Sequence, residues 1–188
     1  LQRANIRSGE DILIQAAASG VGAGAVQMAK LAGLRVIGTA SSEEKCQWAR
    51  DLGADHMINY KTQNFREEVR QLTGGRGVDV VVEHVGADVW EESIRSLTRM
   101  GRLVTCGASS GMQVTANVAH IFHKQLTVIG SNHGTMNELR TVIKLLKEGK
   151  LKAVIGHRLP LSEAAESHRL LENRGTLGKI VLEPEHDD

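Results

Sequence analysis

The sequence predicts an α/β fold in which helices cover both faces of a parallel sheet. Three observations predict it. Short apolar segments rich in Val and Ile alternate with longer segments of helical periodicity. Short turns join these segments, with no low-complexity linker between them. Glycines stand where the helical patterns end, at positions 33, 53, 74, 75 and 101. Alternation of this kind favours parallel strands connected by crossover helices.

The expected elements divide the chain into a main part and a tail. Strands are expected at 11–16, 35–39, 56–59, 78–83, 102–106 and 126–130. Helices are expected at 22–32, 43–52, 65–72, 89–99, 120–124 and 137–148. The segment after residue 150 shows a strand, helix, strand pattern, in which Ser162 caps the helix and 179–182 is β-like. We expect one domain over 1–150 and a C-terminal tail over 151–188.

Composition narrows the functional classes. The net charge is +1 and aromatic residues make up 3% of the chain, so few bases would find a stacking platform and nucleic-acid binding is disfavoured. Cys46 and Cys106 form no CxxC motif, and we expect reduced thiols in a cytoplasmic protein. His120 and His123 lack a carboxylate or cysteine partner nearby, so no metal site is predicted. We find no apolar run of membrane-spanning length and no signal peptide.

The strongest functional signal lies between the first strand and the first helix. There Ala17-x-Ser19-Gly20-Val21-Gly22 occupies the place of the G-x-G-x-x-G fingerprint of dinucleotide binding. Small residues let the chain turn tightly, bring backbone amides against a pyrophosphate and let helix and strand approach closely. The start of the helix then attracts the anion. Because Ala17 and Ser19 replace two glycines, an ordinary strand-to-helix turn is the competing interpretation.

The end of the second strand carries the next signal. Dinucleotide folds place the adenosine ribose there, and an Asp or Glu at that point binds the 2′-hydroxyl of NAD. This chain has Ala40, followed by Ser41, Ser42 and Lys45, which offer hydroxyl donors and a cation to a 2′-phosphate. The competing interpretation is a capping box, Ser41-x-x-Glu44, with a solvated lysine; both interpretations can hold together. Two acidic residues after Ser42 count somewhat against a phosphate. We expect NADP(H) to be preferred over NAD(H).

Five ordered segments extend over nearly the whole chain: SGVGAGAVQMAKLAGLRVIGTASSEEK, LGADHMINY, LTGGRGVDVVVEHVG, GRLVTCGASSG and GTLGKIVLEP. Together they resemble the medium-chain dehydrogenase/reductase superfamily, most closely the branch of NADPH quinone oxidoreductases and zinc-type alcohol dehydrogenases. The resemblance implies a Rossmann-like, doubly wound six-stranded sheet and a tail that returns to a catalytic domain. It also implies an N-terminal barrel-like domain with the substrate pocket and any zinc ligands, and residue 1 of this chain reads as lying after that domain.

The resemblance assigns cofactor contacts residue by residue. Gly20, Val21 and Gly22 would face the pyrophosphate. Ser42, Lys45 and Tyr60 would surround the 2′-phosphate. The nicotinamide side of the cleft would be lined by Val85, Gly86, Gly107, Ala108 and Ser109, with Ser131 and Asn132 as weaker candidates. Lys179 matches a basic position that reaches the cofactor phosphates. Tyr60 and Lys179 also have ordinary interpretations, as a strand-end residue and a surface lysine, and His84 receives no function.

The resemblance implies hydride transfer between the nicotinamide C4 and a carbonyl, an alcohol carbon or an activated alkene. No residue of this chain is assigned a catalytic role. A quinone or enone reductase and a zinc alcohol dehydrogenase both stay open, because their distinguishing residues would lie upstream. An isolated dinucleotide-binding or dimerisation module without activity is the alternative from another class. In relatives the apolar strand at 126–130 pairs with its twin at the sheet edge, so we expect a homodimer or tetramer.

Overall fold

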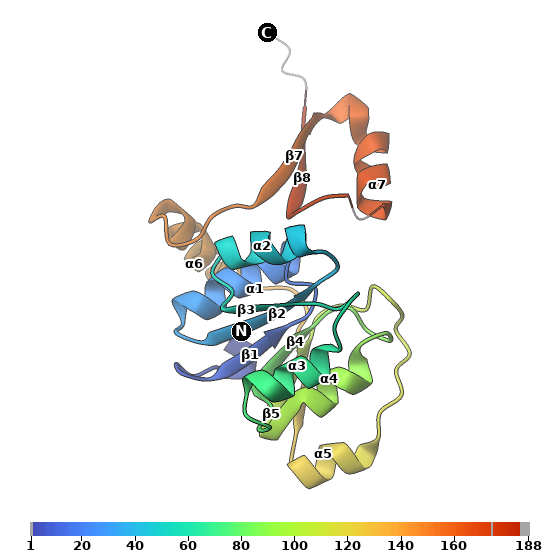
Figure 1. The fold of residues 1–188 in the computed structure, drawn as a ribbon. Coiled ribbons are helices and arrows are strands. Elements are labelled where there is room, and N and C mark those ends of the chain that lie inside the picture. Colours follow the sequence, from blue (N-terminus) through green and yellow to red (C-terminus); the bar gives the residue numbers. More distant parts are fainter. Residues whose placement is uncertain (1, 174, 185–188) are drawn as a thin grey trace.

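The computed structural model describes residues 2–173 and 175–184 (Figure 1). Its main body is a six-stranded parallel sheet in the order β3-β2-β1-β4-β5-β6, which confirms the predicted fold class. The strands are β1 (Asp11–Ile14), β2 (Arg35–Ala40), β3 (His56–Asn59), β4 (Val78–Glu83), β5 (Leu97–Thr105) and β6 (Thr127–Gly130). The six predicted strands are therefore confirmed, with shifts at their ends.

Helices connect these strands. A short 3-10 turn, η1 (Gln2–Ala4), precedes β1. The helices are α1 (Gly20–Leu31), α2 (Glu43–Asp51), α3 (Phe65–Leu72), α4 (Trp90–Ser96), α5 (Val118–Lys124) and α6 (Met136–Lys147). Within the described ranges, none of the helices combines the length and the apolar character needed to cross a membrane.

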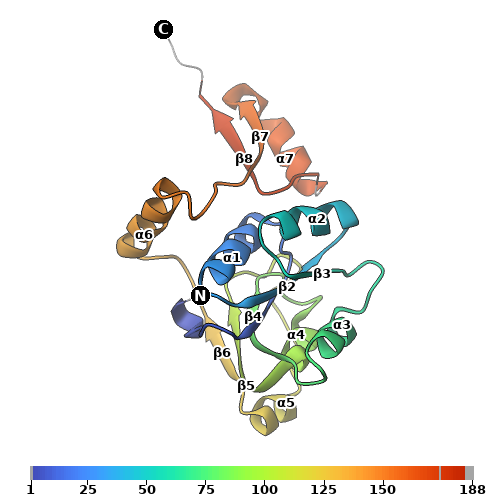
Figure 2. The same ribbon diagram turned by 60° about the vertical axis from the view of Figure 1, so that its left-hand side comes forward.

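The two faces of the sheet carry separate apolar cores because successive strand residues point to opposite sides. Ile12 and Ile14 pack with Val26 of α1 on one face, where α2 also lies. Leu13 packs on the other face with residues of α3 and α4, including Val69 and Ile94. Figures 1 and 2 show the same division, with α1 and α2 on one side of the sheet and α3 and α4 on the other. This is the doubly wound arrangement that the alternating pattern predicts.

The junction of α4 and β5 corrects the predicted boundaries. The helix expected to reach residue 99 ends at Ser96, and Leu97 already pairs with Val78 in the sheet. Gly101 lies buried within β5, so its predicted place at a helix end was wrong. Leu97 is fully buried, and the extended backbone that carries it into the sheet stops the helix early. The other four helix-ending glycines adopt the positive φ expected of them.

The tail forms a second, two-stranded parallel sheet from β7 (Ile155–Pro160) and β8 (Lys179–Glu183). Between them lie a 3-10 turn, η2 (Leu161–Glu163), and α7 (Ala164–Glu172), which confirms the predicted strand, helix, strand pattern. The capping role of Ser162 was wrong. Ser162 lies in the 3-10 turn that follows Pro160, and α7 begins at Ala164 without a side-chain cap.

Two contacts attach the tail to the start and middle of α1. The backbone N–H of Gly178 donates to the carbonyl of Ala18 at 3.3 Å. The amide of Gln27 bonds Lys152 in both directions, accepting from its N–H at 2.8 Å and donating to its carbonyl at 3.2 Å. Figure 1 shows β7 and β8 beyond α1 and α2. The first of these contacts brings the segment at Gly178 against the turn that follows β1.

Candidate functional site

The turn between β1 and α1 is fastened to the end of β2. The N–H of Ala16 donates to Thr39 Oγ1 at 3.1 Å, and the N–H of Ala17 donates to the Thr39 carbonyl at 2.8 Å. Ala16 has a φ of 46°, which is unusual for a residue with a Cβ. The two hydrogen bonds hold this conformation, and the chain then reverses into α1.

Gly22 shows that the turn has the close approach expected of a dinucleotide fingerprint. A Cβ on Gly22 would overlap the carbonyl oxygen of Ala16 and lie 2.6 Å from the Cα of Ala17. Ser19 stands at the N-cap of α1, and its Oγ accepts from the N–H of Gly22 at 3.0 Å. The two replacements of fingerprint glycines therefore keep the geometry: Ala17 is buried beside the helix, and Ser19 caps it.

Lys179 lies over the start of α1. A Cβ on Gly20 would overlap Lys179 Cε and lie 2.7 Å from its Nζ. The first N–H groups of a helix have no intrahelical acceptor, and the helix dipole makes this end positive. A lysine ammonium beside the positive start of a helix fits a pyrophosphate, so the residues present suit a dinucleotide.

The turn lies at the point where the order of the strands reverses. β1 pairs with both β2 and β4, and the crossovers after β1 and β4 run on opposite faces. Ligands of open α/β sheets bind in the crevice at such a point, outside the carboxyl ends of the strands. His84 follows β4, and its Nε2 shares a hydrogen bond of 3.0 Å with Ser19 Oγ across this crevice. Sequence reasoning had assigned His84 no role.

Glu83, the last residue of β4, shapes the loop on its side of the crevice. Its side chain is fully buried, and Oε1 accepts from the N–H groups of Val85 at 2.6 Å and Gly86 at 2.8 Å. Burial raises the pKa of Glu83, and these hydrogen bonds oppose that effect. Glu83 was not among the residues predicted from the sequence, although an acidic residue that ends a run of valines was a signal.

The loops after β4 and β5 pack directly against each other. Gly86 has a φ of 93°, and a Cβ on it would overlap the carbonyl of Gly111 and lie 3.0 Å from Ala108 Cα. A Cβ on Gly107 would lie 3.2 Å from the carbonyl oxygen of His84, which also accepts from the N–H of Ser109 at 3.4 Å. The structure thus brings Val85, Gly86, Gly107, Ala108 and Ser109 together beside His84.

The end of β2 gathers the residues proposed for the adenosine side. Ser42, at the N-cap of α2, accepts from the N–H of Lys45 at 3.3 Å. The capping box at Ser41-x-x-Glu44 was therefore wrong: the helix begins at Glu43, one residue later than that box requires. The N–H of Tyr60 donates to the carbonyl of Ala40 at 3.1 Å, which places Tyr60 beside the same strand end.

Ser131 and Asn132 follow the edge strand β6. The N–H of Ser131 donates to the carbonyl of Thr105 at 2.9 Å, so it lies beside the end of β5. Asn132 is exposed. The strand order then puts Ser42 and Tyr60 on one side of the turn, and the loops after β4, β5 and β6 on the other.

Comparison with known proteins identifies the family of this chain. The family model described as zinc-binding dehydrogenase matches residues 20–148, more than half of the chain. The chain belongs to this family. It is 37% identical to a 2-haloacrylate reductase of Burkholderia sp over 98% of this chain and 58% of that protein. It is also 37% identical to a quinone oxidoreductase of Pseudomonas aeruginosa, over 97% of this chain and 59% of that protein.

A solved structure, an NAD-dependent alcohol dehydrogenase, superimposes with a TM-score of 0.92 at 47% identity, over 97% of this chain and 53% of that one. The relatives are oxidoreductases of the medium-chain dehydrogenase/reductase superfamily, as the sequence predicted. The chain spans 58% and 59% of the length of these two curated relatives and covers the cofactor-binding part of their fold.

A buried polar network supports the turn in this member of the zinc-binding dehydrogenase family. Thr39 Oγ1 donates to Gln15 Oε1 at 2.7 Å, and Gln15 Nε2 donates to Ser93 Oγ at 3.0 Å. All three side chains are buried. The sequence signal for this network was the side-chain amide of Gln15, directly after the apolar residues 12–14. The network links the turn to β2 and α4.

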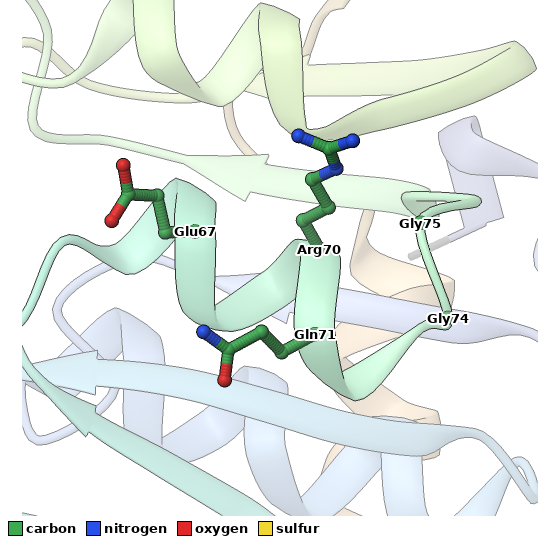
Figure 3. A pocket seen from close by; sticks show the side chains of 5 residues that line it. All are labelled: Glu67, Arg70, Gln71, Gly74 and Gly75. Atoms are coloured by element: carbon green, nitrogen blue, oxygen red, sulfur yellow. The ribbon is translucent and has the colours of Figure 1, made fainter.

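Two grooves in the described part of the chain lie away from this edge. One, of about 420 Å³, runs along α3, where the side chains of Glu67, Arg70 and Gln71 point in different directions (Figure 3). The other, of about 260 Å³, contains several cations that already have partners. Lys124 donates to the carbonyls of Arg95 and Leu97, and Arg76 pairs with Asp11. Neither groove presents groups that converge on one ligand.

Metal-ligand clusters are not found among residues 2–173 and 175–184: no three His, Cys, Asp or Glu side chains come together there. His120 Nε2 instead accepts from Arg95 Nε at 3.2 Å. Both cysteines are free thiols, Cys46 buried in α2 and Cys106 exposed after β5.

Proposed function

We propose that this chain is the cofactor-binding part of an NADP(H)-dependent oxidoreductase that reduces quinones or enones or interconverts alcohols and carbonyls by hydride transfer. The start of α1 carries the proposal. Gly22 lets α1 begin directly against the turn, and Gly20 makes room for Lys179, which adds a positive charge at the same point. A pyrophosphate is the group that this combination suits, and the family membership agrees with it.

The other residues take positions along the bound dinucleotide in this proposal. Ser19, Gly20, Val21, Gly22 and Lys179 hold the pyrophosphate. The 2′-phosphate lies among Ser42, Lys45 and Tyr60. The nicotinamide half lies along the loops after β4, β5 and β6, at Val85, Gly86, Gly107, Ala108, Ser109, Ser131 and Asn132. The cofactor supplies the hydride, while the chain orients it and shields it from water.

Preference for NADP(H) rests on the end of β2. Ala40 stands where an acidic residue would select NAD, and the hydroxyl of Ser42 and the ammonium of Lys45 offer charge-assisted contacts to a phosphate. NAD is the alternative, favoured by Glu43 and Glu44 and by the NAD dependence named for the 47%-identical dehydrogenase.

Calorimetry with NADPH and NADH at low salt tests the preference, because an exposed phosphate contact is least screened there. Ser42→Asp separates the two roles of Ser42: aspartate still caps a helix but repels a phosphate. We expect the wild type to bind NADPH more tightly by about tenfold, and Ser42→Asp to lose that advantage without losing NADH binding. Ser42→Thr, which keeps both cap and hydroxyl, is the control. Equal or stronger NADH binding by the wild type would contradict the preference, and no binding of either would contradict the function.

A dinucleotide-binding or dimerisation module without its own activity is the second candidate, because the residues assigned above all contact the cofactor and none is assigned a catalytic role. Measuring NADPH oxidation by this protein with quinones, enones and aldehydes separates the oxidoreductase from the inactive module. Turnover by the chain itself would exclude the module.

We also propose a division into a dinucleotide-binding domain over 1–150 and a tail over 151–188. The two-stranded sheet of β7 and β8, separate from the main sheet, supports it.

β6 pairs with β5 on one side and forms an edge, and we propose that two copies associate through it. Free thiols suit a reducing compartment, so we propose a cytoplasmic location.

A further inference from the structure

The hydrogen bond between Ser19 and His84 joins the two strand ends that border the crevice. Ser19 Oγ already accepts from the N–H of Gly22, so its proton is available for His84 Nε2. In the tautomer in which the Ser19 hydroxyl donates to Nε2, the proton of the neutral His84 ring lies on Nδ1. That atom is buried and has no hydrogen-bond partner in the part of the chain that the structure describes. The ring therefore lies beside the helix start with one unused polar atom.

The surroundings of His84 favour its neutral form in the free protein. Burial lowers the pKa of His84. Ser19, the hydrogen-bond partner of His84, caps the start of α1, where the helix carries a partial positive charge that disfavours a charged ring. The ammonium of Lys179 lies against the neighbouring Gly20.

Two further titratable groups lie on neighbouring elements. Glu83 ends β4, and its carboxyl group accepts from two backbone N–H groups. Cys106 follows β5. Its side chain is exposed, but partial desolvation and the nearby Glu83 raise the pKa of its thiol, so it stays uncharged. Neither group removes the cost of charging His84.

We propose that His84 is a proton-linked positioning residue: when a dianionic pyrophosphate docks at the start of α1, the ring takes up a proton from solvent. Nε2–H then donates to Ser19 Oγ, and the Ser19 hydroxyl proton is released from His84 and can point to a phosphate oxygen. No other bond changes, and the added positive charge faces the added negative charge. The inference rests on the proposed function, because it requires a dinucleotide in this crevice.

The proposal predicts how affinity depends on pH. The pKa of His84 is depressed in the free protein and would be raised by a neighbouring dianion. Cofactor affinity is then highest below the free-state pKa and falls as the pH rises through the bound-state pKa. Between those values one linked proton changes affinity by up to about tenfold per pH unit.

The experiment is calorimetry of NADPH binding to the protein in two buffers of different ionisation enthalpy, which counts the protons taken up. His84→Gln is the test variant, since its amide can still bond Ser19 but cannot titrate. His168→Gln, on the exposed face of α7, is the matched control. We expect proton uptake near neutral pH by the wild type and the control, and none by His84→Gln. Histidine NMR of the wild type, with and without NADPH, gives a readout that needs no variant.

Four results would overturn the proposal. Binding by the wild type without proton uptake, or an imidazole titration that NADPH does not shift, would refute it and leave the proposed function intact. If folded His84→Gln took up as many protons on binding NADPH as the wild type does, the proton would belong to another group. Absence of binding by both NADPH and NADH would refute the proposal together with the proposed function.

Discussion

The side chain of Lys179 lies against Gly20, although the two residues belong to opposite ends of the chain. Pairing between Ser19 and Gly178 and the hydrogen bond from Gly178 to Ala18 produce this approach. A methyl group on Gly20 would occupy the space of the lysine side chain. The tail thus supplies a charge that the turn itself lacks.

We expect Lys179→Met to weaken NADPH and NADH binding by a similar factor of about three to ten, because the pyrophosphate is common to both. The slope of affinity against salt should also decrease. Gly20→Ala should reproduce the loss by displacing the flexible lysine, and the two changes together should cost little more than either alone. Calorimetry at two salt concentrations measures this. Unchanged affinity in Lys179→Met would identify an ordinary surface lysine.

Replacing two glycines of α1 by alanine, one at a time, should change the stability of the protein in opposite directions. Gly22→Ala places a Cβ into the backbone of Ala16 and Ala17, and we expect a loss of stability of about 1–3 kcal/mol. For a Cβ on Gly24 the structure gives one contact, Met28 Cε at 4.0 Å, so Gly24→Ala should raise stability by about 0.5–1 kcal/mol through helix propensity. Urea unfolding measures both. Equal effects of the two changes would contradict the close approach at Gly22.

Stability should depend on pH through Glu83. Because burial raises the pKa of Glu83 above its ordinary value of 4.5, the folded protein releases this proton at higher pH than the unfolded chain does. The stability linked to this proton is complete below pH 4.5 and is lost as the pH rises through the folded-state pKa.

Glu83→Gln cannot ionise, so its stability relative to the wild type should improve as the pH rises from about 4 to about 8. Thermal unfolding across that range measures the difference. Glu67→Gln, an exposed change on α3, serves as control. Parallel curves for Glu83→Gln and the wild type would show that Glu83 titrates normally.

The edge strand β6 should mediate association of two copies. Val128 in that strand is 42% exposed, and a charged side chain on an edge strand discourages pairing. We expect Val128→Lys to shift a dimer to a monomer in light scattering, while Met112→Lys, in an exposed loop, leaves the mass unchanged. A monomeric wild type at high concentration would contradict the proposal.

Local sequence patterns were sufficient to predict the alternation of strands and helices and the glycine-containing turn before α1. Hydrophobic periodicity and helix-ending glycines depend on neighbours in sequence, so they can be recognised without the fold. The positions of Ser42 and of the loop after β4 at one edge of the sheet follow from the same alternation, because parallel strands all end on that side.

Contacts between segments far apart in the sequence could not be predicted from such patterns. Leu97 became a strand residue because it pairs with Val78, and helix periodicity alone had extended α4 past it. The bond between His84 and Ser19 and the approach of Lys179 to Gly20 arise only when β4 and the tail pack beside the turn. Charge and hydrogen bonding at the start of α1 therefore depend on chain packing, because the groups that provide them come from separate parts of the sequence.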